Sequence, residues 1–185
     1  MTTLNAKAEM NKAAIAAEVA KYAQTKEQAM QSAESAENET ERATFAATAK
    51  KMSTHEKYAT ALSEMSEKAL AALNTYKVEA SELATQSREL KKRSIAILEA
   101  LATKQRVKDT ALDAVLQYIV AKDAVSMTLE QIRHQMQHKT TTQAQYFKTC
   151  AIFFNFATYS KSEKTVIFNK DARIFKDLTA LYTVA

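Results

Sequence analysis

The feature that most constrains the fold is an apolar stripe that steps along the chain by three and four residues between Leu62 and Met136. Because 3.6 residues complete a helical turn, side chains at this spacing lie on one side of a helix. An alternation of three and four is also typical of the seam between helices that pack side by side. The stripe therefore predicts an all-α fold, in which long antiparallel helices form an elongated bundle or coiled coil. Its members are Leu62, Met65, Ala69, Leu73, Tyr76, Ala80, Leu83, Leu90, Ile97 and Leu101, followed by Ala111, Val115, Tyr118, Val125, Leu129, Ile132 and Met136.

The chain of 185 residues contains neither glycine nor proline. Since glycine is the residue that most readily adopts a left-handed backbone, its absence predicts few tight turns and no position that demands this conformation. Glycine-rich nucleotide-binding loops and the nucleophile elbow of hydrolases are excluded too, because they need glycine where the backbone turns sharply or approaches a ligand. We therefore expect a protein that is not an enzyme and that uses no cofactor.

We expect a single helical domain over residues 1–185, divided into three parts by breaks in the helical pattern. Residues 1–36 predict a loosely packed, alanine-rich helix, because small side chains bury little apolar area. Residues 41–139 predict the long helical core, and residues 142–185 predict aromatic-rich C-terminal helices. Near the first break, Asn38 precedes a glutamate by three residues, which is the spacing of a capping box at the start of a helix.

Positive charge is concentrated in the second half of the chain. Residues 101–185 hold 12 Lys and Arg against 7 Asp and Glu, so the whole formal net charge of +5 lies there. Lys104, Arg106 and Lys108 interrupt the apolar stripe, and either a turn or a continuous helix fits residues 102–110. These three are our candidate contacts with an anionic membrane surface. Because the basic residues form no dense run and accompany no recognisable reader motif, we do not expect a nucleic-acid partner.

The most specific local pattern is Glu130, His134 and His138, whose spacing of four places all three on one helical face. Paired histidines at this spacing can bind zinc or another transition metal, with a further ligand from a neighbouring helix. The surrounding residues are polar, however, and histidine near a helix C-terminus also complements the helix dipole. We therefore favour a solvated helical face, and keep the three residues as the candidate metal ligands.

Six aromatic residues fall between Ala144 and Tyr159. Phe153, Phe154 and Phe156 cannot share one helical face, so a helix in this segment must be covered on several sides. We interpret the segment as core or as a subunit interface, with membrane insertion or ligand binding as the alternative. It is too short to cross a bilayer, which takes about 20 predominantly apolar residues.

Two further expectations concern Cys150 and the location of the protein. Cys150 stands among apolar residues, so we interpret it as a small buried hydrophobe. No basic stretch followed by an apolar core occurs near the N-terminus, and we therefore expect no signal peptide. With no transmembrane segment expected either, we predict an intracellular protein that is cytoplasmic or peripheral to a membrane.

Two segments resemble the second and last helices of sorting-nexin-type BAR modules. In those modules a Leu-x-Tyr run leads into an apolar stripe with a terminal basic residue, and the last helix carries a phenylalanine and lysine pattern. The resemblance implies a homodimer with a basic concave face on a curved anionic membrane. The residues that carry it are Leu116, Gln117, Tyr118, Ile119, Val120, Asp123, Ala124, Val125, Leu129 and Arg133, then Val166, Ile167, Phe168, Asn169, Lys170, Phe175, Lys176 and Asp177.

The main functional hypothesis is a non-enzymatic helical scaffold or assembly protein that packs against itself or against other helical proteins. One alternative is a BAR-like module that binds a membrane surface. The other is a helical metal-binding protein that uses the glutamate and the two histidines named above.

Overall fold

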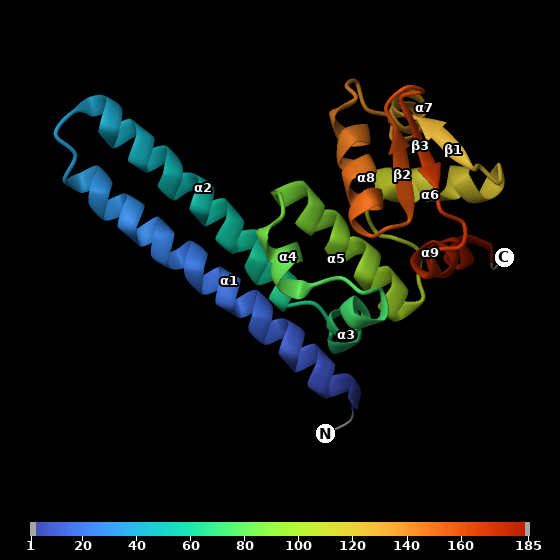
Figure 1. Ribbon diagram of the computed structural model, residues 1–185, viewed down its shortest axis with the longest axis horizontal. Helices are drawn as coiled ribbons and strands as arrows, with labels where there is room; N and C mark the ends of the chain where they lie inside the picture. Colours follow the sequence, from blue (N-terminus) through green and yellow to red (C-terminus); the bar gives the residue numbers. More distant parts are fainter. Residues whose placement is uncertain (1–2, 184–185) are drawn as a thin grey trace. The chain divides into compact units, whose positions relative to one another are not determined.

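A computed structural model describes residues 3–183, of which 72% are helical and 6% lie in strands (Figure 1). The prediction of a mainly helical protein is therefore confirmed, but the structure also contains a small sheet that was not predicted. The elements within these residues are α1 (Thr3–Glu34), α2 (Glu39–Ser63), α3 (Glu67–Thr75), α4 (Ala80–Thr85), α5 (Arg88–Thr103), α6 (Thr110–Ala121), β1 (Ser126–Thr128), α7 (Leu129–Gln135), α8 (Thr142–Phe153), β2 (Ala157–Ser160), β3 (Thr165–Phe168) and α9 (Arg173–Thr183).

The chain packs as two compact units rather than as the one domain that we expected. Unit 1 holds the described residues up to Leu73 together with Val78–Lys91. Unit 2 holds Asn74–Lys77 and the described residues from Lys92 onward. The boundary falls within α5, between its fourth and fifth residues.

Unit 1 is built on a helical hairpin in which α1 and α2 lie side by side (Figure 1). Asn38 caps α2 as predicted, because its side chain accepts a hydrogen bond from the backbone nitrogen of Glu41 at 2.9 Å. The hairpin itself buries few large side chains, since four of its six buried residues are alanines. The six are Ala8, Ile15 and Ala29 of α1 and Ala49, Ala59 and Leu62 of α2.

The long helical core expected over residues 41–139 is divided into six shorter helices and a strand. The expectation that no residue would need a left-handed backbone is wrong. Among residues 3–183, six residues other than glycine have φ between 46° and 57°, and five of them lie one or two residues past the end of a helix. The six are Lys77, Lys104, Asp123, Gln137, Asn155 and Lys164. The chain can end its helices without glycine because hydrogen bonds compensate for the strain.

The end of α6 illustrates this compensation. Asp123, with φ of 46°, donates its backbone N–H to Val120, and the next residue, Ala124, donates to Ile119 at 2.9 Å. These two bonds satisfy carbonyl groups that the helix end would otherwise leave unpaired. The same device ends α5 at Lys104, so residues 102–110 contain a turn, which was one of the two options left open by the sequence.

Unit 2 contains a three-stranded antiparallel sheet with the order β1-β3-β2. Side chains alternate between its faces, as the period of a strand requires. Met127 of β1, Val166 and Phe168 of β3 and Ala157 of β2 are buried, while Ile167 points outward and is 40% exposed. The sheet is therefore covered on one face only.

The predicted role of the aromatic segment as core is correct for two of its three named phenylalanines. Phe154 is 2% exposed and Phe156 is fully buried, whereas Phe153 is only partly covered. Phe156 packs on Phe147 of α8 with ring centroids 6.4 Å apart, and on Phe175 of α9. Residues 142–183 thus combine two helices with two strands, and their phenylalanines hold these elements together.

The left-handed residues give a prediction in which the same substitution has opposite signs at two sites of one helix. Replacing Lys104, just past the end of α5, with glycine removes the steric cost of the left-handed backbone and is expected to raise the free energy of unfolding by about 1 kcal/mol. Replacing Lys92 within α5 with glycine is expected to lower the free energy of unfolding by about 1 kcal/mol. Chemical denaturation of both variants measures the two changes, and equal signs would contradict this account of the helix end.

Candidate functional site

The candidate metal ligands are not brought together. Glu130 and His134 lie on α7, but the helix ends at Gln135 and Gln137 has a left-handed backbone, so His138 leaves the shared face. The carboxylate of Glu130 accepts hydrogen bonds from the guanidinium of Arg133, which lowers the pKa of Glu130. Within residues 3–183, no three acidic, histidine or cysteine side chains are grouped so that they could hold a metal ion.

The candidate anionic-surface residues Lys104, Arg106 and Lys108 are exposed in the loop between α5 and α6. The guanidinium of Arg106 lies over the ring of Tyr182, 5.2 Å from its centroid. The hydroxyl of Tyr182 in turn donates to Asp113 at 2.8 Å. Their role as contacts with a membrane stays a prediction. None of the described helices is long and apolar enough to cross a bilayer.

The residues that carry the resemblance to BAR modules belong to several short elements. Leu116–Val120 lie in α6, Leu129 and Arg133 lie in α7, and Val166–Phe168 form β3. The resemblance was drawn to two longer helices, and it stays a prediction about function that the arrangement of these elements does not test.

In unit 2 the consecutive helices α7 and α8 form a helix-turn-helix in the literal sense of two packed helices joined by a short connection. The first helix, α7, begins with a capping box: Thr128 Oγ1 accepts from Gln131 N at 3.1 Å, and Gln131 Oε1 accepts from Thr128 N at 2.8 Å. A connection of six residues, 136–141, leads to the second helix, α8. The two helices pack on each other, with Ile132 of α7 and Ala144 of α8 fully buried.

The two faces of α8 differ in character. Its inner face is apolar and consists of Ala144, Phe147, Cys150 and Ala151, all buried. Its outer face carries Thr142, Gln145, Tyr146, Thr149 and Ile152, which are exposed or half-buried. Threonine, glutamine and tyrosine side chains can both donate and accept hydrogen bonds. The outer face therefore offers hydrogen-bonding groups on a helix whose position is fixed by its inner face.

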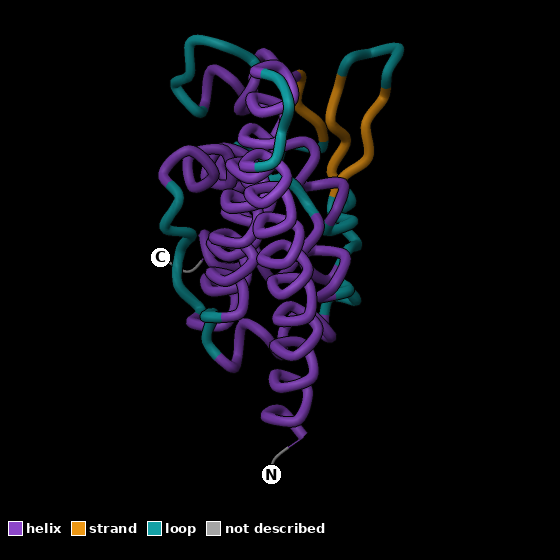
Figure 2. The backbone as a smooth tube through the Cα atoms, turned by 90° about the vertical axis from the view of Figure 1, so that its left-hand side faces the viewer, coloured by secondary structure: helices purple, strands orange, loops and turns teal. Residues whose placement is uncertain are grey.

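The β2–β3 hairpin packs beside α8, and its turn is free in solvent (Figure 2). Lys148 of α8 extends over the ring of Tyr159 of β2, with its ammonium nitrogen 4.5 Å from the ring centroid. The turn, residues 161–164, is exposed throughout and carries Lys161 and Lys164. Because Glu163 lies in the same turn, the hairpin that flanks the helix-turn-helix carries a formal net charge of +1.

The charge of the chain divides sharply between the two units. Unit 2 carries 15 Lys and Arg against 8 Asp and Glu, a formal net charge of +7. Unit 1 carries 11 against 13, a formal net charge of −2. A positive field of this size attracts anionic partners to unit 2.

Unit 1 contains a buried lysine that sequence reasoning missed. The ammonium of Lys91 donates to the carbonyl oxygens of Ala84 at 2.5 Å and His55 at 3.4 Å, and lies 4.9 Å from the ring centroid of Tyr22. Among the described residues it forms no ion pair, and its burial lowers the pKa of Lys91 to about 8. Because Lys91 is fully buried, we interpret it as a link between helices and not as a group that meets a substrate.

Cys150 is fully buried, as the sequence predicted. Burial raises the pKa of its thiol to about 12, and the positive charge of Arg93 only partly opposes this effect. A thiol in this state carries no nucleophilic chemistry at neutral pH.

Comparisons with protein-family models, with curated proteins and with solved structures give no match for this chain. The helix-turn-helix therefore rests on the contacts and burial of α7 and α8 alone. One sequence signal could have located its first helix, namely Thr128 followed three residues later by Gln131 ahead of an apolar residue.

The buried lysine predicts a stability that rises with pH. The pKa of Lys91 is about 8 in the folded chain and 10.5 ordinarily, so between these values the unfolded chain binds more protons. The free energy of unfolding therefore increases with pH in this window. Denaturation between about pH 8 and about pH 9, below the ordinary tyrosine pKa of about 10, should show this increase for the wild type relative to Lys91→Met. Parallel profiles would contradict it.

Proposed function

We propose that this protein is a non-enzymatic assembly protein that binds duplex DNA through unit 2. The observation that carries the proposal is the polar outer face of α8, the second helix of a helix-turn-helix, in a unit with a formal net charge of +7. DNA-binding proteins of this kind place the second helix in the major groove, where it meets the base edges. The proposal rests on this geometry and on the charge of the unit.

The side chains on the outer face of α8 suit the chemistry of base edges. A glutamine such as Gln145 can bond adenine through both atoms of its amide, and a threonine such as Thr149 can bond several bases. Thr149 is exposed and Gln145 is half-buried. The Thr149 hydroxyl donates to the Gln145 carbonyl oxygen at 2.9 Å, so it keeps its acceptor lone pairs for a base. We therefore assign direct contact with bases to the outer face of α8.

The β2–β3 hairpin supplies contacts with the DNA backbone. Lys161 and Lys164 occupy an exposed turn and can approach phosphate groups on either side of the groove that receives α8. Contacts of this type set the affinity and make it dependent on salt, while base contacts set the sequence preference. Duplex RNA is a poorer fit, because its major groove is too narrow and deep for an α-helix.

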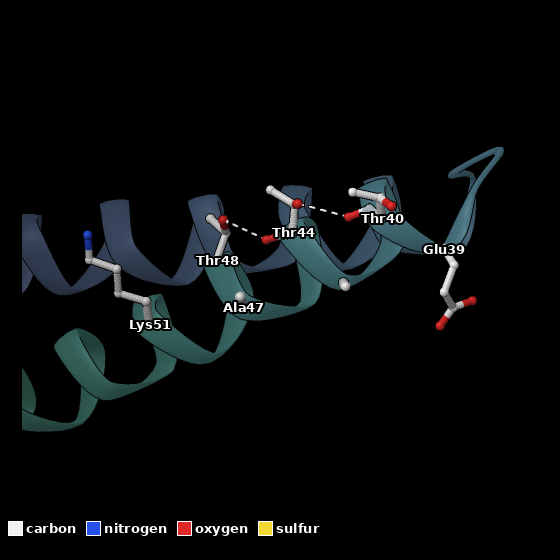
Figure 3. Close-up of a pocket in the computed structure, with 7 residues that line it drawn as sticks. Glu39, Thr40, Thr44, Ala47, Thr48 and Lys51 are labelled. Carbon is white, nitrogen blue, oxygen red and sulfur yellow. Dashed lines mark hydrogen bonds between the residues drawn. The ribbon is translucent and has the colours of Figure 1, made fainter.

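The assembly function is assigned to the α1–α2 hairpin of unit 1. One face of α2 presents small side chains, with Thr40, Ala43, Thr44 and Ala47 forming a shallow groove between Glu39 and Lys51 (Figure 3). Small residues allow the backbone of another helix to approach closely. Two helices that bury mostly alanine gain little stability from each other, which supports further packing against helices of a partner.

The membrane and metal alternatives have less support. A BAR-like role rests on the sequence resemblance and on the exposed Lys104, Arg106 and Lys108. Metal binding rests on side chains that do not meet. Binding to phosphatidylserine liposomes is the outcome that would favour the membrane role over DNA.

The DNA proposal predicts that charge reversal in the hairpin turn weakens binding. The double substitution Lys161→Glu and Lys164→Glu should lower the affinity for a random-sequence DNA duplex by more than about tenfold, because two phosphate contacts become repulsive. It should also reduce the dependence of the affinity on salt. Fluorescence anisotropy with labelled duplex, over a range of salt concentrations, measures both quantities.

A double reversal of equal charge in unit 1, Lys50→Glu and Lys57→Glu, is the matched control. Both lysines are exposed on α2, outside the proposed DNA-binding unit, so the affinity should change by less than about twofold. Equal losses in the two double variants would mean that only net charge matters. A wild type without salt-sensitive duplex binding would exclude the proposal.

The assembly proposal predicts that the α2 groove is needed for association. Replacing Ala43 and Ala47 with glutamate leaves the fold intact, because both are exposed, but places two charges where a partner helix would pack. Light scattering of the wild type should show a complex that the double variant lacks. Ala46→Glu, on a different exposed face of α2, should keep the complex, and a monomeric wild type would restrict assembly to other partners.

A further inference from the structure

Arg93 of α5 is a buried cation whose charge lacks a full set of partners. It is 3% exposed, and one of its terminal nitrogens, Nη2, donates to Gln143 Oε1 at 2.6 Å. Its Nε and Nη1 atoms are buried without a hydrogen-bond partner among residues 3–183. Burying a guanidinium in this way costs stability, because an ionised group loses its water without full replacement.

The hydrogen bond from Arg93 ends on the first turn of α8. Gln143 is the second residue of this helix, which is 12 residues long. The residue that caps α8, Thr141, makes no side-chain bond with the first-turn amides. By contrast, side chains of Asn38, Asp109 and Thr128 cap α2, α6 and α7. The N-terminus of α8 therefore keeps its N–H donors and the positive end of its dipole.

The guanidinium of Arg93 and the positive end of the α8 dipole thus lie close together in unit 2. Among the described residues, Arg93 forms no ion pair with a carboxylate. A guanidinium has only donors, so Gln143 must turn Oε1 toward Arg93. The amide nitrogen Nε2 of Gln143 then faces away from Arg93 as a further donor. Arg93 in this way fixes the orientation of a donor beside the free N–H groups of the helix.

The surroundings add further donors for an anion. Lys139, Thr140, Thr141 and Thr142 are exposed immediately before and at the start of α8. Hydroxyl, amide and ammonium groups near a helix N-terminus are the groups that bind phosphate in many proteins. A cluster of donors with uncompensated positive charge is complementary to a dianionic or monoanionic oxyanion.

We propose that the N-terminus of α8, with Gln143 as a direct donor and Arg93 as the residue that positions it, is a phosphate-binding subsite. The inference rests on the proposed function, because it assigns to this subsite a phosphate of the DNA backbone next to the groove that receives α8. Arg93 acts here as a positioning residue, since its own atoms are covered.

The first test measures thermal stability with inorganic phosphate as the probe, against chloride at equal ionic strength. Phosphate should raise the melting temperature of the full-length wild type. Gln143→Glu places a carboxylate on Arg93 and at the positive end of the helix dipole, so it should melt higher than the wild type without phosphate and lose the response to phosphate. Arg93→Met removes the buried charge at similar volume, and should keep or raise the melting temperature while losing the response.

Lys92→Met is the matched control, because it removes one charge from the same helix at an exposed position. It should respond to phosphate as the wild type does. Equal responses of wild type and Gln143→Glu would overturn the subsite, even if Arg93→Met failed to fold. A lower melting temperature of Gln143→Glu would also overturn it, because the carboxylate would then meet no uncompensated positive charge.

The second test uses labelled duplex DNA and separates this inference from the proposed function. Gln143→Glu should weaken duplex binding by about tenfold or more. It should also reduce the slope of log affinity against log salt by about 1, because the added carboxylate offsets one positive charge at the interface. If the wild type and Gln143→Glu bind duplex equally, the subsite is wrong while the DNA function stands. If phosphate protects the wild type but duplex does not bind, the assignment to DNA is wrong, and vesicles that carry phosphomonoester lipids show whether a headgroup takes the subsite instead.

Discussion

The packing of Phe147 against the sheet is the interaction on which the proposed DNA-binding surface depends. Its ring meets Phe156 and Phe168 with centroids 6.4 and 6.5 Å apart, so the inner face of α8 is fixed to the strands that follow it. Because a helix presents opposite sides to core and solvent, this contact also determines which residues of α8 face outward. The outer face owes its polar character to this division, and the β2–β3 hairpin owes its position beside α8 to the same aromatic contacts.

The absence of glycine determines which side chains lie at the turns of the molecule. Helices end at residues such as Lys104, Gln137 and Asn155 in left-handed backbone conformations, which places polar or charged side chains at turns where most proteins use glycine. Lys164 occupies such a position in the hairpin turn proposed to contact DNA. The start of α8 also lacks a common feature of helix ends, because no side chain caps the helix. In our account, the donors left there bind an anion, together with Gln143, which Arg93 positions.

The sequence allowed the helical class, the cap at Asn38 and the burial of Cys150 to be predicted, because each depends on neighbours within a few residues. The strands were missed because they are three and four residues long and exist through pairing, as between Ser126 and Ile167, that no local pattern reveals. Glu130, His134 and His138 were expected to share one helical face because the helix was expected to continue past His138, but α7 ends at Gln135. The expectation of no nucleic-acid partner rested on the absence of a dense run of basic residues, and it stays a prediction. The excess of positive charge in the second half was visible in the sequence, and grouping the residues by unit raises the contrast to +7 against −2. Arg93 and Gln143 are 50 positions apart in the chain, and only the fold brings them together.

The central claim is that α8 and the β2–β3 hairpin form one surface that binds duplex DNA. Hydrogen exchange of the full-length protein, with and without a DNA duplex, tests this most directly because it reports on every segment at once. The account predicts slower exchange on binding at residues 139–152 and 160–165, with the α1–α2 hairpin unchanged. Slower exchange confined to the α1–α2 hairpin or to the loop with Lys104, Arg106 and Lys108, or no change in any segment, would contradict it.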